Sequence, residues 1–172
     1  MDYDAVFLAS DARVAMHEGG YQANPNDPGN WTGGALGKGT LKGTNFGISA
    51  MEYPNLDIVN LTAADAQAIR FQDYWQKYGY GNLLPAIAGK VYDIAINEGP
   101  GTAAHCLQRA VRACGSTLVD DGIMGSGTVA AANHCVAACL IVGLRAEIAA
   151  HYREHAPSND LPGLLARAYD ET

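Results

Sequence analysis

The sequence predicts a mainly α-helical fold with a long glycine-rich loop and a short β-hairpin near its N-terminus. Apolar residues recur at helical spacing over most of the chain, and residues 22–47 are dense in Gly, Asn, Pro and Thr. We find no convincing strand of a central sheet. The chain has 172 residues, 48% of them hydrophobic and 17% charged, which is enough for one ordinary globular core.

The N-terminal region is predicted to be a helix followed by a long loop. Apolar and charged residues interleave over residues 4–18, and Gly19-Gly20 would end that helix. Residues 22–47 are predicted as loop, with a short hairpin around residues 36–41. A loop of this length inside a compact domain is uncommon and tends to carry function.

Six helical stretches are predicted after this loop. Thr62 has the character of a helix N-cap, and the helix that it opens continues through aromatic residues to Tyr78. Gly99-Pro100-Gly101 would stop the next helix, and Gly115 the one after it. The other stretches are residues 87–95, 107–114, a segment from Thr128, 135–155 and 161–169.

Charge and hydropathy exclude several classes of function. A formal net charge of −7 argues against a nucleic-acid partner and against an anionic membrane surface. The longest apolar run, residues 136–144, is far shorter than the roughly 20 residues of a membrane helix, so we expect no membrane insertion. The acidic start Met1-Asp2-Tyr3-Asp4 lacks the basic region of a signal peptide, so we expect synthesis in a bacterial-type cytoplasm.

Four cysteines fall in the C-terminal half: Cys106, Cys114, Cys135 and Cys139. His-Cys pairs at residues 105–106 and 134–135 leave a zinc site conceivable, but the tight C-x-x-C spacing is missing, so we expect no metal. Free thiols packed as small hydrophobes are the simplest interpretation. A disulfide between two helices is the alternative if the protein matures outside a reducing compartment.

Glu18 is the strongest candidate for an acid catalyst. A carboxylate at a helix C-terminus faces the negative end of the helix dipole, which disfavours its charged form by about 0.3–1 kcal/mol. The two glycines that follow would allow a bulky ligand to approach closely. Asp27 is the leading second carboxylate. Spacing alone also fits a surface glutamate before a helix end and a turn-forming aspartate between Asn26 and Pro28.

A family resemblance strengthens the first interpretation. The runs Glu18-Gly19-Gly20-Tyr21, Asn24-Pro25-Asn26-Asp27-Pro28-Gly29 and Thr44-Asn45-Phe46-Gly47-Ile48 together resemble the N-terminal signature of glycoside hydrolase family 108, the bacterial and phage N-acetylmuramidases. The second half resembles the peptidoglycan-binding region usually fused to it. It is matched in order at Asp93, Asn97 and residues 99–101, 107–110 and 121–125, although residues 162–167 lack the tryptophan of the family pattern.

The resemblance implies a lysozyme-like fold that cleaves the β-1,4 bond between N-acetylmuramic acid and N-acetylglucosamine without a cofactor. It assigns the catalytic acid to Glu18 and carries over Asp27 and a water-holding threonine. Because residues 30–43 are inserted relative to the shorter family form, that threonine is either Thr44, which we favour for its matching neighbours, or Thr32.

Aromatic rings and planar amides are the side chains that bind sugars. The candidate glycan contacts are Tyr21, Trp31, Thr32, Asn45, Asp93 and Asn97. Asp93 and Asn97 share one helix face and could instead hold the two halves of the chain together.

We expect a catalytic region over residues 1–84 and a peptidoglycan-binding region over residues 85–172, packed as one compact, monomeric unit. The expected partner is a peptidoglycan strand, cut by an endolysin-type enzyme after its release to the cell wall. The alternatives are a non-catalytic peptidoglycan-binding or scaffold protein and a lytic transglycosylase, and a phage lysis role and a secretion-system role both stay open.

Overall fold

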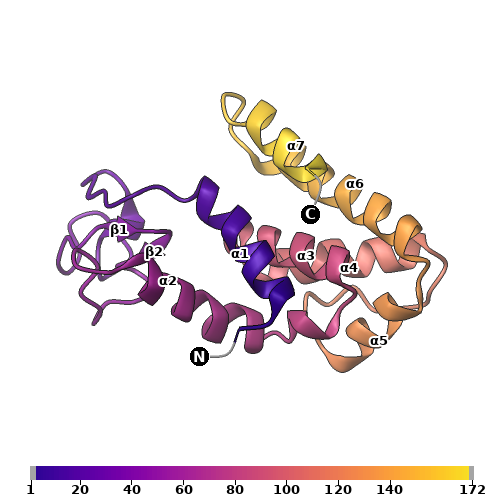
Figure 1. The fold of residues 1–172 in the computed structure, drawn as a ribbon. Coiled ribbons are helices and arrows are strands. Elements are labelled where there is room, and N and C mark those ends of the chain that lie inside the picture. Colours follow the sequence, from indigo (N-terminus) through magenta and orange to yellow (C-terminus); the bar gives the residue numbers. More distant parts are fainter. Residues whose placement is uncertain (1–2, 171–172) are drawn as a thin grey trace. The chain divides into compact units, whose positions relative to one another are not determined.

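The computed structural model describes residues 3–170 and confirms the predicted mainly helical fold (Figure 1). Within these residues the α-helices are α1 (Ala5–His17), α2 (Ala63–Arg70), α3 (Pro85–Glu98), α4 (Pro100–Ala113), α5 (Ser126–His134), α6 (Ala137–His155) and α7 (Leu161–Tyr169). Two short strands, β1 (Thr44–Asn45) and β2 (Ile48–Ser49), pair antiparallel. Shorter helical turns are η1 (Pro28–Asn30), η2 (Phe71–Gln76) and η3 (Tyr80–Asn82).

The contacts divide the chain into two compact units. Residues 11–71 form one, which we call the loop unit, and residues 3–10 together with 72–170 form the other, the helical unit. Helix α1 therefore contributes its first turns to the helical unit and the rest to the loop unit. The predicted boundary at residue 84 separates a catalytic from a peptidoglycan-binding region. The grouping by contacts does not test these functions, so the boundary stays a prediction.

The hairpin of the loop unit lies at residues 44–49 instead of around residues 36–41. Thr44 pairs with Ser49 and Asn45 with Ile48, and Phe46-Gly47 joins the strands. Both turn residues have positive φ, 50° and 78°, which is the backbone twist that a two-residue hairpin favours. Residues 36–41 also turn back, because the N–H of Gly33 donates to the carbonyl of Lys38.

A small apolar core supports this hairpin. Its buried residues are Ile48, Ala50, Ile58, Leu61 and Ala66. Helix α2 begins as predicted: the Thr62 side chain accepts a hydrogen bond from the N–H of Asp65, and the Asp65 carboxylate accepts one from the N–H of Thr62.

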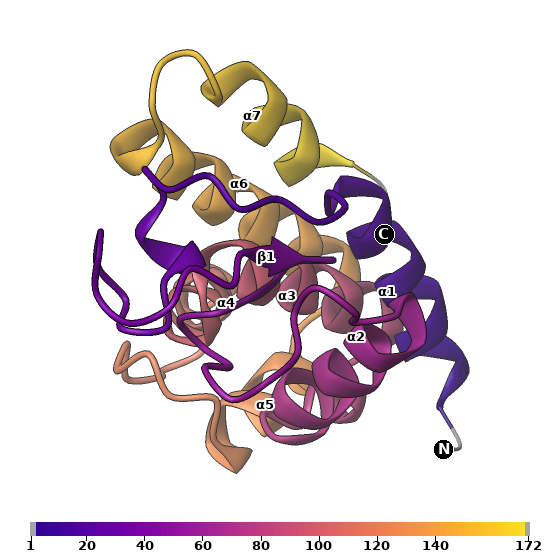
Figure 2. The same ribbon diagram turned by 90° about the vertical axis from the view of Figure 1, so that its left-hand side faces the viewer.

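In the helical unit, α4 packs against α3 and α6, and α7 lies along α6 (Figure 2). An aromatic cluster of Phe7, Trp75, Tyr80 and Tyr92 fills part of its core, with the Trp75 and Tyr92 ring centroids 5.4 Å apart. Gly99, with φ of 90°, separates α3 from α4 as the sequence predicted. None of the described helices combines the length and the apolar character needed to cross a bilayer.

Candidate active site

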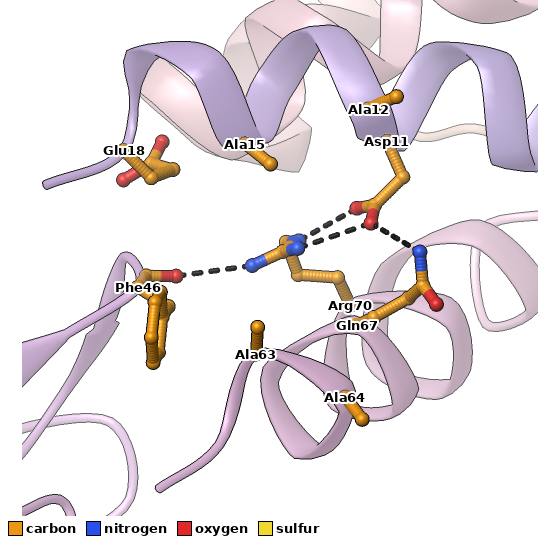
Figure 3. A pocket seen from close by; sticks show the side chains of 9 residues that line it. All are labelled: Asp11, Ala12, Ala15, Glu18, Phe46, Ala63, Ala64, Gln67 and Arg70. Carbon is orange, nitrogen blue, oxygen red and sulfur yellow. Dashed lines mark hydrogen bonds and ion pairs between the residues drawn. The ribbon is translucent and has the colours of Figure 1, made fainter. Parts of the chain in front are cut away.

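A pocket of about 310 Å³ opens in the loop unit (Figure 3). Helix α1 and the residue after it line one wall with Asp11, Ala15 and Glu18, which recur at i, i+4 and i+7. Helix α2 lines another with Ala63, Gln67 and Arg70 at the same spacing. The remaining lining residues are Ala12, Phe46 and Ala64. The volume is at the lower end of the range for ligand pockets, about 300–1,000 Å³.

Glu18 lies where the sequence predicted, directly after the last residue of α1. Its N–H still donates to the carbonyl of Val14 at 3.2 Å, so the side chain continues the helical face that lines the pocket. The residue is half-buried, and its carboxylate lies against the α-carbon of Gly47. A Cβ atom at Gly47 would overlap the carboxylate, so only glycine permits this approach.

A buried ion pair borders the pocket beside Glu18. The guanidinium group of Arg70 donates from Nε to Asp11 Oδ1 at 2.6 Å and from Nη2 to Asp11 Oδ2 at 3.0 Å. The two side chains are only 5% and 2% exposed. Gln67 Nε2 donates to Asp11 Oδ2 at 3.0 Å, so both carboxylate oxygens of Asp11 are satisfied.

Hydrogen bonds to the N–H and to the carbonyl of Phe46 fix the Phe46-Gly47 turn. Its N–H donates to the carbonyl of Gly19 at 3.2 Å, and its carbonyl accepts from Arg70 Nη1 at 3.0 Å. Phe46 is the one non-glycine residue with positive φ in the part of the chain that the structure describes. Such a conformation costs free energy and persists where neighbouring groups hold it.

Sequence reasoning missed Asp11, Gln67, Arg70 and Phe46 as pocket residues. A signal for one of them was present, because Asp11 interrupts the apolar stripe that runs from Phe7 to Val14 on α1. A charged residue on a buried helix face implies a buried partner. Finding Arg70 from sequence would still have required knowing which residue, 59 positions along the chain, α1 contacts.

Asp27 caps η1 in the structure. Its Oδ1 accepts from the N–H of Gly29 at 2.9 Å, and its Oδ2 accepts from Gln22 Nε2 at 3.3 Å. It does not belong to the lining of the pocket beside Glu18. The turn-forming interpretation of Asp27 therefore describes its present contacts, and its role as second carboxylate stays a prediction.

The two candidate water-holding threonines also make contacts within the loop unit. Thr44 Oγ1 donates to Asn30 Oδ1 at 2.7 Å, and Thr32 Oγ1 accepts from the N–H of Thr40 at 2.9 Å. Neither lines the pocket. The choice between them stays open.

The candidate glycan contacts of the loop unit differ in exposure. Tyr21 is 46% exposed, and Trp31 is half-buried with its Nε1 donating to the carbonyl of Pro25 at 3.0 Å. Asn45 is only 4% exposed, and its amide nitrogen donates to the carbonyls of Ile58 and Leu61 at 3.1 and 3.3 Å. Tyr21 and Trp31 are thus accessible to a ligand, whereas Asn45 holds the hairpin in place.

Asp93 and Asn97 share one face of α3, as expected, and contact α7 and α6. Arg167 donates to both carboxylate oxygens of Asp93, with the shortest distance 2.8 Å from Nη2 to Oδ1. Asn97 Nδ2 donates to the Tyr152 hydroxyl at 2.9 Å. These contacts tie three helices of the helical unit together. The predicted role of both residues in glycan binding is not tested by them.

The cysteines carry free thiols, and two of them lie close together. Cys114 Sγ at the end of α4 and Cys139 Sγ in the first turn of α6 are 2.9 Å apart. Among residues 3–170, no group of three or more His, Cys, Asp or Glu side chains is arranged to hold a metal ion.

Comparisons with known proteins agree with the fold and identify the family. The chain is similar to the solved structure of SagA from Brucella abortus, with a TM-score of 0.68 and 24% sequence identity over 94% of this chain and 92% of that one. No curated protein sequence matches it. The family described as glycosyl hydrolase 108 matches residues 12–99, just over half of the chain, and this segment contains Glu18 and every residue that lines the pocket except Asp11. The chain therefore belongs to glycosyl hydrolase family 108.

Proposed function

We propose that the protein is a peptidoglycan hydrolase of the N-acetylmuramidase type, which cleaves the β-1,4 bond between N-acetylmuramic acid and N-acetylglucosamine. Membership of a glycoside hydrolase family supports a glycan substrate. The observation that carries the proposal is that Glu18 lines the pocket of the family-matched segment, with its carboxylate against the bare backbone of Gly47.

In this proposal Glu18 is the general acid. The leaving oxygen of a glycosidic bond needs a proton as the bond breaks, and a positioned carboxylic acid supplies it. The position of Glu18 after the last turn of α1 supports this role, because the helix dipole disfavours a negative charge there. The alanines of the lining leave room for a sugar ring beside the carboxyl group.

Asp27 is proposed as the second carboxylate, which activates water or stabilises the positive charge that develops on the sugar. Thr44, or alternatively Thr32, would orient that water. The separation of the two carboxyl groups in the substrate complex would decide the outcome, with about 5–5.5 Å giving retention and about 6.5–9.5 Å giving inversion of the anomeric centre.

The remaining assignments extend the same proposal to the glycan strand. Tyr21, Trp31 and Asn45 would contact or support the sugars beside the pocket, and residues 1–84 would form the catalytic region. Residues 85–172, with Asp93 and Asn97, would bind peptidoglycan. We propose an endolysin-type enzyme that acts on the cell wall as a monomer, in phage lysis or beside a secretion system.

The test is the release of reducing ends from purified peptidoglycan. Glu18→Gln keeps the size of the side chain but cannot donate the proton, so we expect turnover to fall by at least about 1,000-fold with binding and melting temperature retained. Glu154→Gln, an exposed position on α6, is the matched control and should keep full activity. Turnover retained in Glu18→Gln would overturn the proposal.

A lytic transglycosylase is the second candidate function, and the set of carboxylates that line the pocket supports it. The lining contains two carboxylates, Glu18 and Asp11, and Asp11 is engaged by Arg70 and Gln67. A transglycosylase needs the glutamate alone and forms an anhydro sugar instead of adding water. Full activity of Asp27→Ala together with an anhydro product would establish this candidate and reject hydrolysis.

A further inference from the structure

We infer that Arg70 is a positioning residue, which holds the Phe46-Gly47 turn against Glu18 and thereby fixes the direction of the Glu18 carboxyl group. The inference rests on the proposed role of Glu18 in one respect only, the effect on turnover. The mechanical part, that Arg70 holds the turn on Glu18, has its own test.

Arg70 is suited to this task by the geometry of its guanidinium group. Two of its nitrogens are fixed on the Asp11 carboxylate, at 2.6 and 3.0 Å, so the orientation of the plane is set. The third nitrogen, Nη1, then points at the carbonyl of Phe46 at 3.0 Å (Figure 3). A lysine ammonium group could not make all three contacts with this planar geometry.

The turn that Arg70 holds would otherwise relax. Phe46 has φ of 50°, a left-handed conformation that a phenylalanine rarely adopts. Two hydrogen bonds hold Phe46 in this strained conformation. Its carbonyl accepts from Arg70, and its N–H donates to the carbonyl of Gly19. Gly19 is the residue next to Glu18, so the turn and the candidate acid are tied to the same piece of backbone.

Gly47 transmits this constraint to Glu18. Its α-carbon lies against the carboxylate, close enough that a Cβ would overlap it. The glycine backbone therefore blocks one direction for the side chain. A general acid must present its proton within hydrogen-bond reach of the leaving oxygen, and displacements of about 1 Å can cost about 100-fold in rate.

The first test removes the positioning contact without leaving a buried charge. In the paired variant Asp11→Leu/Arg70→Met, both partners of the ion pair become apolar side chains, a change that folded proteins commonly tolerate. We expect kcat to fall about 10- to 100-fold, with KM changed by less than about 3-fold. Arg70→Lys keeps a positively charged partner for Asp11 but loses the planar group that also reaches Phe46, so it should lower kcat in the same way.

Unchanged kcat in the paired variant, or in Arg70→Lys if the paired variant does not fold, would overturn the inference. A rise in KM with kcat retained would also contradict the inference, because that result assigns Arg70 to substrate binding.

The second test does not depend on activity. Gly47→Ala and Gly37→Ala both place an alanine at positive φ, 78° and 71°, but an added Cβ meets Glu18 at residue 47 and nothing within 4 Å at residue 37. Gly47→Ala should therefore lower the melting temperature more than its matched control Gly37→Ala.

This excess loss should disappear when Glu18→Ala is added, because the carboxylate that the Cβ would meet is then gone. It should also disappear when the paired variant is the background, because the turn can then move away. An excess that persists in the paired background would show that Arg70 does not hold the turn, even if Glu18 is the acid. An inactive wild-type protein that still shows the coupling would reject the proposed function alone.

A second inference is carried by the thiols. We propose that Cys114 and Cys139 form a disulfide when the protein meets an oxidising compartment. The two sulfurs are 2.9 Å apart, less than 1 Å more than the bond of about 2.05 Å that would join them. Cys114 directly follows α4 and Cys139 lies in the first turn of α6, and these two helices pack against each other, so the bond would close a loop between residues 114 and 139.

The reaction needs an external disulfide as oxidant, such as oxidised glutathione. The exposed Cys139 attacks it first, forms a mixed disulfide and releases one thiol. Cys114 then attacks the Cys139 sulfur and releases the second thiol, so two electrons and two protons pass to the oxidant. Cys106 is only 2% exposed, so the oxidant cannot reach this thiol, and it stays out of the exchange.

Intact mass and peptide mapping after incubation with oxidised glutathione test the proposal. We expect a mass lower by two hydrogen atoms, a Cys114–Cys139 linked peptide and a melting temperature roughly 5–10 °C higher, reversed by dithiothreitol. Cys139→Ser should abolish the shift, and the matched control Cys135→Ser, between α5 and α6, should keep it. Unchanged mass, or linkage through Cys135, would contradict the proposal.

Discussion

The loop unit and the helical unit are stabilised in different ways. Six of the ten positive-φ residues among residues 3–170 fall in the loop unit, at positions 34, 37, 39, 43, 46 and 47. The helical unit is built from packed α-helices around fully buried residues such as Tyr92, Leu107 and Leu144. The segment with the candidate acid therefore depends on individual polar atoms in addition to its small apolar core, whereas the helical unit depends mainly on buried apolar area.

Asn30 is the clearest example in the loop unit. It is fully buried, its amide nitrogen donates to Gln22 and Asn24, and its amide oxygen accepts from Gln22 and Thr44. Its backbone carbonyl accepts two further bonds from Lys42 and Gly43. The side chain and carbonyl of this one residue therefore connect residues 22–24 with residues 42–44 of the loop.

The largest expected effect is in the helical unit. Leu144→Ala should lower the free energy of unfolding by about 3–4 kcal/mol, because the leucine is fully buried in α6 and its removal leaves a cavity. Urea unfolding measures this loss. Val142→Ala, on the same helix but 65% exposed, is the matched control and should change stability by less than about 0.5 kcal/mol.

The next effect should be local to the loop unit. Asn30→Ala removes the four hydrogen bonds that the buried side chain makes with Gln22, Asn24 and Thr44, and we expect a loss of about 2–3 kcal/mol. Hydrogen exchange should then accelerate over residues 22–45 while α4 and α6 keep their protection. Asn55→Ala, at an exposed position of the same unit, should leave exchange unchanged. Equal acceleration in both units would contradict the division between them.

A smaller effect is expected at the start of α2. Thr62→Ala removes the N-cap that accepts from the N–H of Asp65 and should cost about 1 kcal/mol. Since α2 carries Arg70, the same variant should also reduce turnover modestly. Thr117→Ala, at an exposed position outside the helices, serves as control for both measurements.

The smallest effect is expected in a loop of the helical unit, at Asp121. Hydrogen bonds from Gln108 and from the N–H of Ile123 lower the pKa of Asp121 from its ordinary value. An aspartate with a depressed folded-state pKa stabilises the fold above its unfolded pKa of about 3.9, and this contribution is lost as the pH falls through the folded value.

The melting temperature of the wild type should therefore fall more steeply below about pH 4 than that of Asp121→Asn. Asp160→Asn, whose side chain makes no capping bond to α7, should behave like the wild type. Identical acid profiles for all three proteins would show that this loop does not depend on its polar contacts.

The same contrast explains what could be predicted from the sequence. Helical periodicity and capping residues such as Thr62 and Gly99 act locally, so most helices were predicted close to their observed bounds. Two differ: α4 begins at Pro100 and not at residue 107, and the helix opened by Thr62 ends at Arg70 and continues as η2. The hairpin was predicted at the wrong residues, because the turn is set by positive φ at Phe46 and Gly47 and not by apolar alternation.

The site divides in the same way. Glu18 was predicted from a helix end, two glycines and above all the family resemblance of its motif, and it lines the pocket. Arg70 and Asp11 were not, because their pairing depends on contacts between segments far apart in the chain. Asn45 was predicted to contact sugars, whereas its amide binds the carbonyls of Ile58 and Leu61, which no local pattern indicates.

The chemistry at Glu18 is tested most directly by mass spectrometry of the muropeptides that wild-type protein releases from purified peptidoglycan. We expect fragments that end in a reducing N-acetylmuramic acid, formed by the wild type and absent with Glu18→Gln. Fragments that end in a reducing N-acetylglucosamine or in an anhydro sugar, or identical products from both proteins, would contradict it.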